Sequence, residues 1–184
     1  MSALSAEEPI DSEEIPPEVP PGKPRMARVP TTMQVVAAEC GAASLASILG
    51  HFRAYRPLEE VREAVGVDRD GSNALRIMRA ARHFGLEAEG LQCEPENFDE
   101  ITLPAILYWG LNHFVVLEGW TKSGYRIMDP ALGRRLVSAD EFNQEFTGVV
   151  VQMEPGPIPT LIPSAPASIS ARVAAAVATF PATT

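Results

Sequence analysis

A chain of 184 residues has room for one globular domain with a sizeable core, together with dispensable ends. Its formal net charge is -9 and its lysines and arginines form no cluster, so nucleic acid and anionic membrane surfaces are poor partners. Its two cysteines, Cys40 and Cys93, are too few for a disulfide framework, which favours the reducing cytoplasm as the compartment.

The first segment, residues 1–28, is acidic and rich in proline. Because it has little apolar surface to bury, it is predicted to be a disordered arm. A secretory signal would need a basic start followed by an apolar run, and this segment has neither. We therefore expect a folded domain at residues 29–157 that stays in the cytoplasm.

A helix that begins at or near Cys40 is predicted next. Alanine, serine, leucine and isoleucine fill the segment, and the apolar residues Leu45, Ile48, Leu49 and Phe52 recur at helical spacing. Unpaired backbone N–H groups at a helix start carry partial positive charge and favour a thiolate over a thiol. Cys40 is therefore a candidate nucleophile, and the alternative is the small buried side chain that a free cysteine usually is.

Two further helices are predicted at residues 57–65 and 74–84. Ser72 or Asn73 is expected to cap the second of them, which stops at Gly85. The second helix is expected to bury one stripe of side chains, formed by Leu75, Met78, Ala81 and Arg82.

From residue 86 onward the predicted elements are mostly strands, at residues 86–91, 104–109, 113–120, 125–128 and 148–153. A short helix from Ser138 to about Phe146 is expected from the capping-box spacing of Ser138 and Glu141. Helices followed by a run of strands predict an α+β domain, in which the N-terminal helices pack on a mostly antiparallel sheet.

The last segment, residues 158–184, is rich in proline, serine and alanine and is predicted to be a linker with a short apolar tail. The tail, Ala171 to Phe180, contains Arg172 and falls well short of the roughly 20 residues that a spanning helix needs.

His113 is the candidate base for a Cys40 thiolate, which needs an imidazole to take its proton. His51 lies at the far end of the predicted Cys40 helix, and His83 ends another helix, so neither is suited to the role. His113 opens a very apolar strand. The alternative is a buried histidine whose ring is satisfied by a backbone carbonyl.

Asp129 is the candidate acceptor that would orient the imidazole. A three-residue loop, Thr121–Ser123, would place Asp129 opposite Val115 and one diagonal step from His113, within reach of two polar side chains. An even-numbered loop would place them on opposite faces. The alternative is an ordinary turn that ends the strand at Pro130.

Gln34 completes the candidate site. Its side-chain amide could point at the carbonyl oxygen of a bound peptide, and with the backbone N–H of Cys40 it would form an oxyanion hole. The order of the four groups, Gln34, Cys40, His113 and Asp129, is that of papain-like cysteine peptidases.

Three segments carry a resemblance to a family: Gln34 to Leu45, which contains Glu-Cys-Gly-Ala-Ala-Ser-Leu, then Asn112 to Gly119, and Asp129-Pro130. They resemble the peptidase domains of bacterial peptide-exporting ABC transporters, which remove double-glycine leaders from bacteriocins and related peptides. Three more segments are similar to the branch that handles nitrile-hydratase-type leaders: Arg69 to Ser72, Leu103 to Leu107, and Glu141 to Val150.

This resemblance covers residues 29–157 and implies a papain-like fold and cleavage after a Gly-Gly or Gly-Ala pair. It implies that Cys40 is the nucleophile, His113 the base, Asp129 the orienting acid and Gln34 the oxyanion donor. The implied partners are the leader of a precursor peptide and a membrane ABC exporter, at whose cytoplasmic face the peptidase would work. We expect no cofactor and no metal.

The family's ATPase domain has no counterpart here, since the sequence has no G-x-x-x-x-G-K-[ST] phosphate loop. We therefore expect either a stand-alone peptidase that works with a separate exporter or a shortened relative. Three other functions stay open. They are a non-cleaving module that binds the leader, a transglutaminase-like or deamidating enzyme, and a metal site of Cys40, Cys93 and His113, whose spacing is poor for a metal.

Overall fold

The computed structural model describes residues 26–69 and 71–156. The predicted tail at residues 158–184 and most of the predicted arm at residues 1–28 lie outside these residues. In chain order the elements are η1 (Ala37–Glu39), α1 (Cys40–His51), α2 (Leu58–Val65), α3 (Ala74–His83), β1 (Leu86–Gln92), η2 (Pro95–Glu100), β2 (Ala105–Trp109), β3 (His113–Thr121), β4 (Gly124–Asp129), β5 (Gly133–Val137), α4 (Ala139–Glu145) and β6 (Phe146–Pro155). None of the described helices is long and apolar enough to cross a bilayer.

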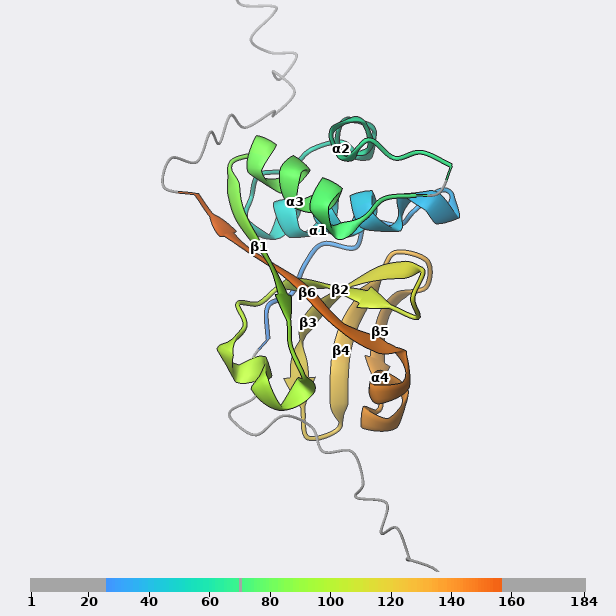
Figure 1. Cartoon of the computed structure of the whole chain (residues 1–184), viewed down its shortest axis with the longest axis vertical. Helices are drawn as coiled ribbons and strands as arrows, with labels where there is room; N and C mark the ends of the chain where they lie inside the picture. The colour runs from blue at the N-terminus through green and yellow to red at the C-terminus, as the bar shows by residue number, and fades with distance from the viewer. Residues whose placement is uncertain (1–25, 70, 157–184) are drawn as a thin grey trace, which may run out of the picture.

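Three N-terminal helices form one layer and the sheet forms the other, as Figure 1 shows. The six strands have the order β1-β6-β2-β3-β4-β5, and all neighbours are antiparallel. One core lies between this sheet and α1–α3, and a second core on the opposite face is closed by Phe98 of η2 and Phe142 of α4. The predicted α+β arrangement of N-terminal helices on an antiparallel sheet is therefore confirmed.

The central helix, α1, is buried from Cys40 to Leu49. Its small residues let it pack closely on the sheet, where the Ser44 hydroxyl donates a hydrogen bond to the carbonyl of Phe114 in β3 at 3.2 Å. The predicted start of this helix at or near Cys40 is confirmed, since Cys40 is its first residue.

The predicted buried stripe of α3 is right for Ala81, which is buried, and for Met78, which packs against the core, but wrong for Leu75 and Arg82, which are exposed. Asn73 caps the helix, but its buried side chains are Ile77, Ala80 and Ala81, whereas Leu75 is 48% exposed. Because α3 packs on β1, α2 and α1, the position of these neighbours decides which of its side chains are buried.

Strand β5 was not predicted, since its sequence Gly-Arg-Arg-Leu-Val has no apolar alternation. It is an edge strand that pairs only with β4, and Val137 is its one buried residue. An edge strand needs little apolar surface, so its sequence carries a weak signal.

The β3–β4 hairpin differs from the prediction in its loop but keeps the predicted offset. Thr121 pairs with Gly124, so the loop has two residues rather than three. A bulge at Glu118, between Leu117 and Gly119, then shifts the register by one residue. Val116 consequently pairs with Met128, which sets Asp129 opposite Val115.

The described chain begins along β3, ahead of the predicted boundary at residue 29. Met26 bridges to Gly119, and the backbone N–H of Ala27 donates to the carbonyl of Glu118 at 2.7 Å. The backbone N–H of Val29 donates to the Glu118 carboxylate at 2.9 Å. Main-chain pairing to a distant strand leaves no local sequence signal. The pairing with β3 therefore could not be predicted from the acidic, proline-rich composition of the arm.

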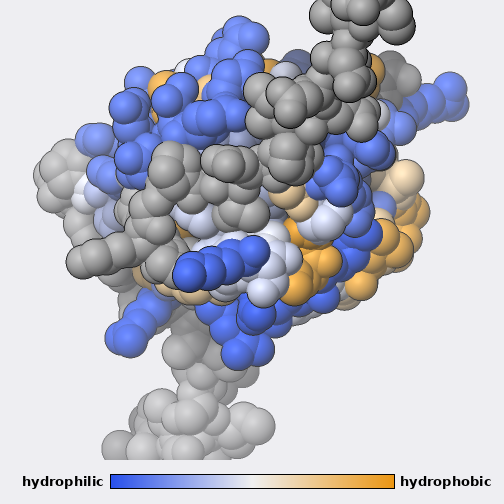
Figure 2. All heavy atoms as spheres, turned by 90° about the horizontal axis from the view of Figure 1, so that it is seen from below, coloured by the Kyte–Doolittle hydropathy of each residue, from blue (hydrophilic) through white to orange (hydrophobic). Residues whose placement is uncertain are grey.

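The end of the molecule away from α1–α3 is largely hydrophilic, with apolar side chains gathered on one flank, as Figure 2 shows. The buried apolar side chains lie in the two cores on either side of the sheet.

Candidate active site

Cys40 lies at the junction of two helices. The short helix η1 leads directly into α1, whose first residue is Cys40. The side chain of Cys40 is largely buried but lines a hollow, and it lies close enough to the imidazole of His113 to raise the pKa of that ring. The thiol at the start of α1 and the imidazole at the start of β3 therefore lie together.

His113 and Asp129 form the second contact of the site. The Nε2 atom of His113 lies 2.9 Å from Oδ1 of Asp129, and both side chains are mostly buried. The same Oδ1 accepts the backbone N–H of Ala131 at 2.8 Å, in the turn after Pro130. Asp129 therefore ends the strand and also holds the imidazole ring.

The charges of this pair support each other. Burial is the largest influence on His113 and lowers its pKa, but hydrogen bonds to Asp129 and Cys40 and the charges of both outweigh it and raise the pKa to about 9. Burial would raise the pKa of Asp129, but the hydrogen bonds from His113 and from the backbone of Ala131 and Leu132 lower it. At neutral pH the pair is therefore an imidazolium and a carboxylate.

Gln34 lies on the same side of the site as His113. Its backbone N–H donates to the carbonyl of Pro130 at 2.9 Å, and its side chain lines a hollow together with His113 and Asp129. Its Oε1 atom is buried and has no hydrogen-bond partner among the described residues. The carboxamide is therefore held at the site without being committed to an internal partner.

Two hollows flank these groups. One has a volume of about 560 Å³ and is lined by Gln34 and His113, and the other has a volume of about 350 Å³ and is lined by Cys40 and Gly71. Ala37 lines both hollows, so they meet beside the thiol and the imidazole. An extended peptide could therefore run from one hollow to the other across Cys40.

Gly41 lets the second hollow form close to the thiol. A Cβ atom at Gly41 would lie 2.3 Å from Oγ of Ser72 and 2.8 Å from Cδ1 of Ile77. Only a glycine allows the loop before α3 to approach the start of α1 this closely. Arg69, Gly71 and Ser72, which belong to one of the segments that resemble the family, therefore lie on a wall of the site.

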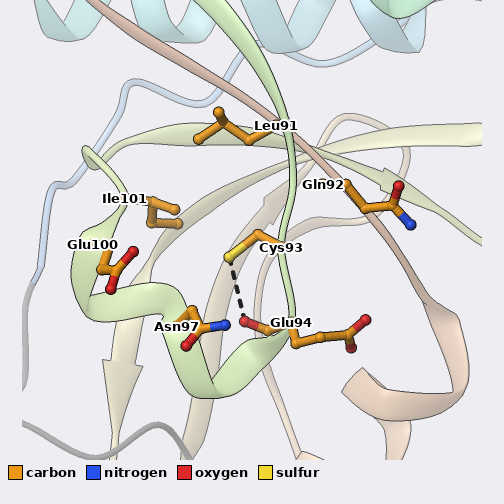
Figure 3. Close-up of a pocket in the computed structure, with 7 residues that line it drawn as sticks. All are labelled: Leu91, Gln92, Cys93, Glu94, Asn97, Glu100 and Ile101. Atoms are coloured by element: carbon orange, nitrogen blue, oxygen red, sulfur yellow. Dashed lines mark hydrogen bonds between the residues drawn. The ribbon is translucent and has the colours of Figure 1, made fainter.

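The remaining histidines and Cys93 lie elsewhere. His51 Nδ1 lies 2.9 Å from the carbonyl of Arg28, and His83 ends α3. Cys93 lines a separate hollow at the end of β1, with neither Cys40 nor His113 on its walls (Figure 3). Within residues 26–69 and 71–156, no group of three or more histidine, cysteine or acidic residues could hold a metal ion.

Cys40 is expected to be the reactive thiol and Cys93 the slow one. Burial, followed by the charges of four nearby acidic residues, raises the pKa of the Cys93 thiol, which also donates to the carbonyl of Glu94 at 3.3 Å. Limiting iodoacetamide at neutral pH, followed by peptide mass spectrometry, should find the label on Cys40 although Cys93 is more exposed. Preferential labelling of Cys93 would overturn the assignment.

Two buried acidic residues near the site were not predicted from the sequence. Glu39 and Glu118 are almost fully buried, and each accepts backbone N–H groups of the segment that leads to Gln34 and Cys40. Their partners Arg62 and Arg134 are distant in sequence, so spacing alone could not reveal them.

Comparison with solved structures finds the same fold. A double glycine motif protease from an AMS/PCAT transporter, solved in complex with the leader peptide, matches with a TM-score of 0.70 and 46% identity, covering 72% of this chain and 97% of that one. The peptidase domain of Streptococcus ComA, a bi-functional ABC transporter of a quorum sensing pathway, matches with a TM-score of 0.65 and 26% identity, covering 70% and 98%. The predicted papain-like peptidase fold is confirmed.

Comparison of sequences gives the same assignment. The probable microcin-H47 secretion/processing ATP-binding protein MchF of Escherichia coli is 36% identical over 129 residues, which are 70% of this chain. The transport/processing ATP-binding protein ComA of Streptococcus pneumoniae R6 is 32% identical over 132 residues, or 67% of this chain. The chain spans 18% of the length of each of these relatives. The model of the peptidase C39 family matches residues 28–158, and the chain therefore belongs to this family of cysteine peptidases.

Proposed function

We propose that this chain is an endopeptidase that removes the leader from a ribosomally made, bacteriocin-like peptide by cutting after a Gly-Gly or Gly-Ala pair. The observation that carries the proposal is the grouping of Cys40, His113 and Asp129, in which His113 is hydrogen-bonded to Asp129 and its pKa is raised by both neighbours, in a fold shared with a leader-bound protease of 46% identity. Family membership supplies the reaction class, and the grouping supplies a nucleophile, a proton carrier and an orienting carboxylate.

The proposed acylation step uses four residues. The Cys40 thiolate attacks the carbonyl carbon before the scissile bond, and the oxygen gains negative charge while facing the Gln34 amide and the Cys40 backbone N–H. The His113 imidazolium gives its proton to the departing nitrogen, so the C–N bond breaks and a thioester remains. Asp129 stabilises the imidazolium and keeps its ring in place.

Hydrolysis of the thioester completes the cycle. Neutral His113 takes a proton from a water molecule as that water attacks the thioester carbonyl. The C–S bond then breaks, which returns the thiolate of Cys40 and the imidazolium of His113. The leader leaves with a new carboxylate at its end, and the two products differ from the substrate by one added water.

The direction of the bound peptide follows from where the proton goes. The departing nitrogen receives its proton from His113, so the cargo half lies in the hollow that His113 lines. The leader half lies on the Cys40 side, where Ala37, Ala38 and Gly71 present small side chains or none. Because the residues that line this hollow near the thiol are small, the main chain of the peptide can lie directly against them. A glycine before the scissile bond is favoured, since it has no side chain to hold the main chain away.

The proposed partner is a membrane ABC exporter. Several matching relatives carry secretion or transport, processing and ATP-binding in their names, and this chain corresponds to less than a fifth of the length of each of them. We propose that the peptidase works beside such an exporter at the cytoplasmic face of the membrane. The nitrile-hydratase-type leader remains the predicted substrate branch.

The decisive experiment is incubation of the purified chain with a panel of precursor peptides whose leaders end in Gly-Gly, Gly-Ala or a bulkier pair. Mass spectrometry should find cleavage after the small pairs, and the Cys40→Ala variant should bind the same leaders without cutting them. Binding without cleavage by the wild-type chain would support the non-cleaving module instead. An intact but deamidated peptide would support the deamidating alternative.

A further inference from the structure

We propose that Glu39 is a positioning residue, which holds the segment between Gln34 and Cys40 so that both halves of the oxyanion hole are spaced correctly. The inference rests on the proposed function and adds to it a residue that acts through Gln34. Glu39 touches neither the reacting atoms nor the imidazole in this scheme.

The carboxylate of Glu39 is buried, and both of its oxygens have partners. Its side chain is 2% exposed, and its Oε2 atom accepts the backbone N–H of Val35 at 2.8 Å and of Val36 at 3.2 Å. Its Oε1 atom lies 2.9 Å from Nε of Arg62 on α2. A buried carboxylate is retained at low cost only when its charge and its lone pairs are satisfied, and here both conditions are met.

The segment that Glu39 holds has little else to fix it. Val35 is 82% exposed and Val36 is 54% exposed, so apolar packing does not anchor them. The main chain is tied at its two ends, where Gln34 donates to Pro130 and the Glu39 N–H donates to the carbonyl of Val36 at 3.1 Å. Between these ends, the Glu39 carboxylate makes the two hydrogen bonds that set the path of the chain.

This path determines where the Gln34 amide lies relative to Cys40. An oxyanion hole works only when its donors lie roughly 2.7–3.1 Å from the position that the charged oxygen will take. In a released segment Gln34 would keep its backbone hydrogen bond to Pro130 but its distance from Cys40 would no longer be fixed, while the Cys40 thiol would stay in place because α1 is buried from Cys40 to Leu49. Loss of Glu39 should therefore impair charge stabilisation and leave the nucleophile intact.

The test replaces Glu39 with glutamine, which has the same size but only one acceptor oxygen. When that oxygen faces the N–H groups of Val35 and Val36, its NH₂ group meets the guanidinium of Arg62, donor against donor. We expect kcat for leader cleavage to fall about 10-fold with KM nearly unchanged, against about 10²–10³-fold for Gln34→Ala.

Two further readouts separate positioning from general damage. Iodoacetamide reacts with a thiolate by displacement at a saturated carbon, so it forms no oxyanion and needs no Gln34. The rate of Cys40 alkylation across pH should therefore match wild type in Glu39→Gln. The double variant Glu39→Gln/Gln34→Ala should lose no more activity than Gln34→Ala alone, because Glu39 acts through Gln34.

Glu60→Gln is the matched control, since Glu60 is an exposed acid of α2 that pairs with Arg56, away from Gln34 and Cys40, and its loss should leave kcat unchanged. If Glu39→Gln does not fold, Glu39→Asp keeps the charge but shortens the reach to the Val35 and Val36 N–H groups, and its kcat should also fall. The inference is overturned if either variant slows alkylation, or if its loss multiplies with that of Gln34→Ala. A wild-type chain that cleaves no leader would instead refute the proposed function.

Discussion

Replacing His113 with alanine is expected to remove leader cleavage almost completely, whereas replacing Asp129 with asparagine should cost only about 10- to 100-fold in kcat/KM. In the proposed mechanism His113 carries the proton from the thiol to the departing amine, and no other group there can replace it. The Asp129 carboxylate lies 2.9 Å from the imidazole of His113, and the Cys40 side chain, which also raises the pKa of His113, still favours the imidazolium when the carboxylate is gone.

The pH profile of the same variants tests the reason for this difference. The imidazolium is the proton donor, so wild-type kcat/KM should fall as pH rises through about 9, the raised pKa of His113. Asparagine removes the charge that helps to raise this pKa, so the alkaline fall should move to lower pH. Equal losses in His113→Ala and Asp129→Asn, with an unmoved alkaline limb, would mean that Asp129 only ends the strand.

Replacing Glu118 with alanine is expected to lower the free energy of unfolding by about 3–5 kcal/mol, the usual cost of removing one partner from a buried ion pair. Glu118 is fully buried and lies 2.7 Å and 2.9 Å from two nitrogens of Arg134. Arg134 also donates to the carbonyl of Val29 at 2.7 Å, and Val29 donates to Glu118. The substitution leaves a half-buried guanidinium and a backbone N–H without their acceptor.

The test compares the free energy of unfolding of Glu118→Ala with that of Glu141→Ala, measured with a chemical denaturant. Glu141 pairs with Arg135 at 2.9 Å, but both side chains are partly exposed, so its loss should cost about 0–1 kcal/mol. Equal small effects would show that the Glu118 pair contributes no more than a surface pair.

The parts of the molecule that depend on local pattern could be predicted from the sequence. Helical spacing placed Cys40 at the start of α1, and the ends of two apolar runs placed His113 and Asp129 at neighbouring strand ends. These features follow from a period of 3.6 or 2 residues and from breakers such as Pro130, which act over short distances.

The parts that depend on partners far along the chain could not be predicted. Which side of α3 is buried depends on the elements that pack against it. The contacts of Glu39 with Arg62 and of Glu118 with Arg134 likewise join separate elements. In the β3–β4 hairpin the predicted offset is right although the predicted loop is wrong, because the bulge at Glu118 supplies the odd residue that the loop lacks.

That bulge makes the hairpin sensitive to length at one place and tolerant at another. Side chains alternate along a strand, so deleting Glu118, or inserting one residue between it and His113, would turn His113 and Asp129 to opposite faces. Residues added between Lys122 and Ser123 lie beyond the last pair, Thr121 with Gly124, and would leave the pairing unchanged. An affinity tag or a fluorophore can thus be attached at the hairpin tip without disturbing the pairing that places His113 next to Asp129.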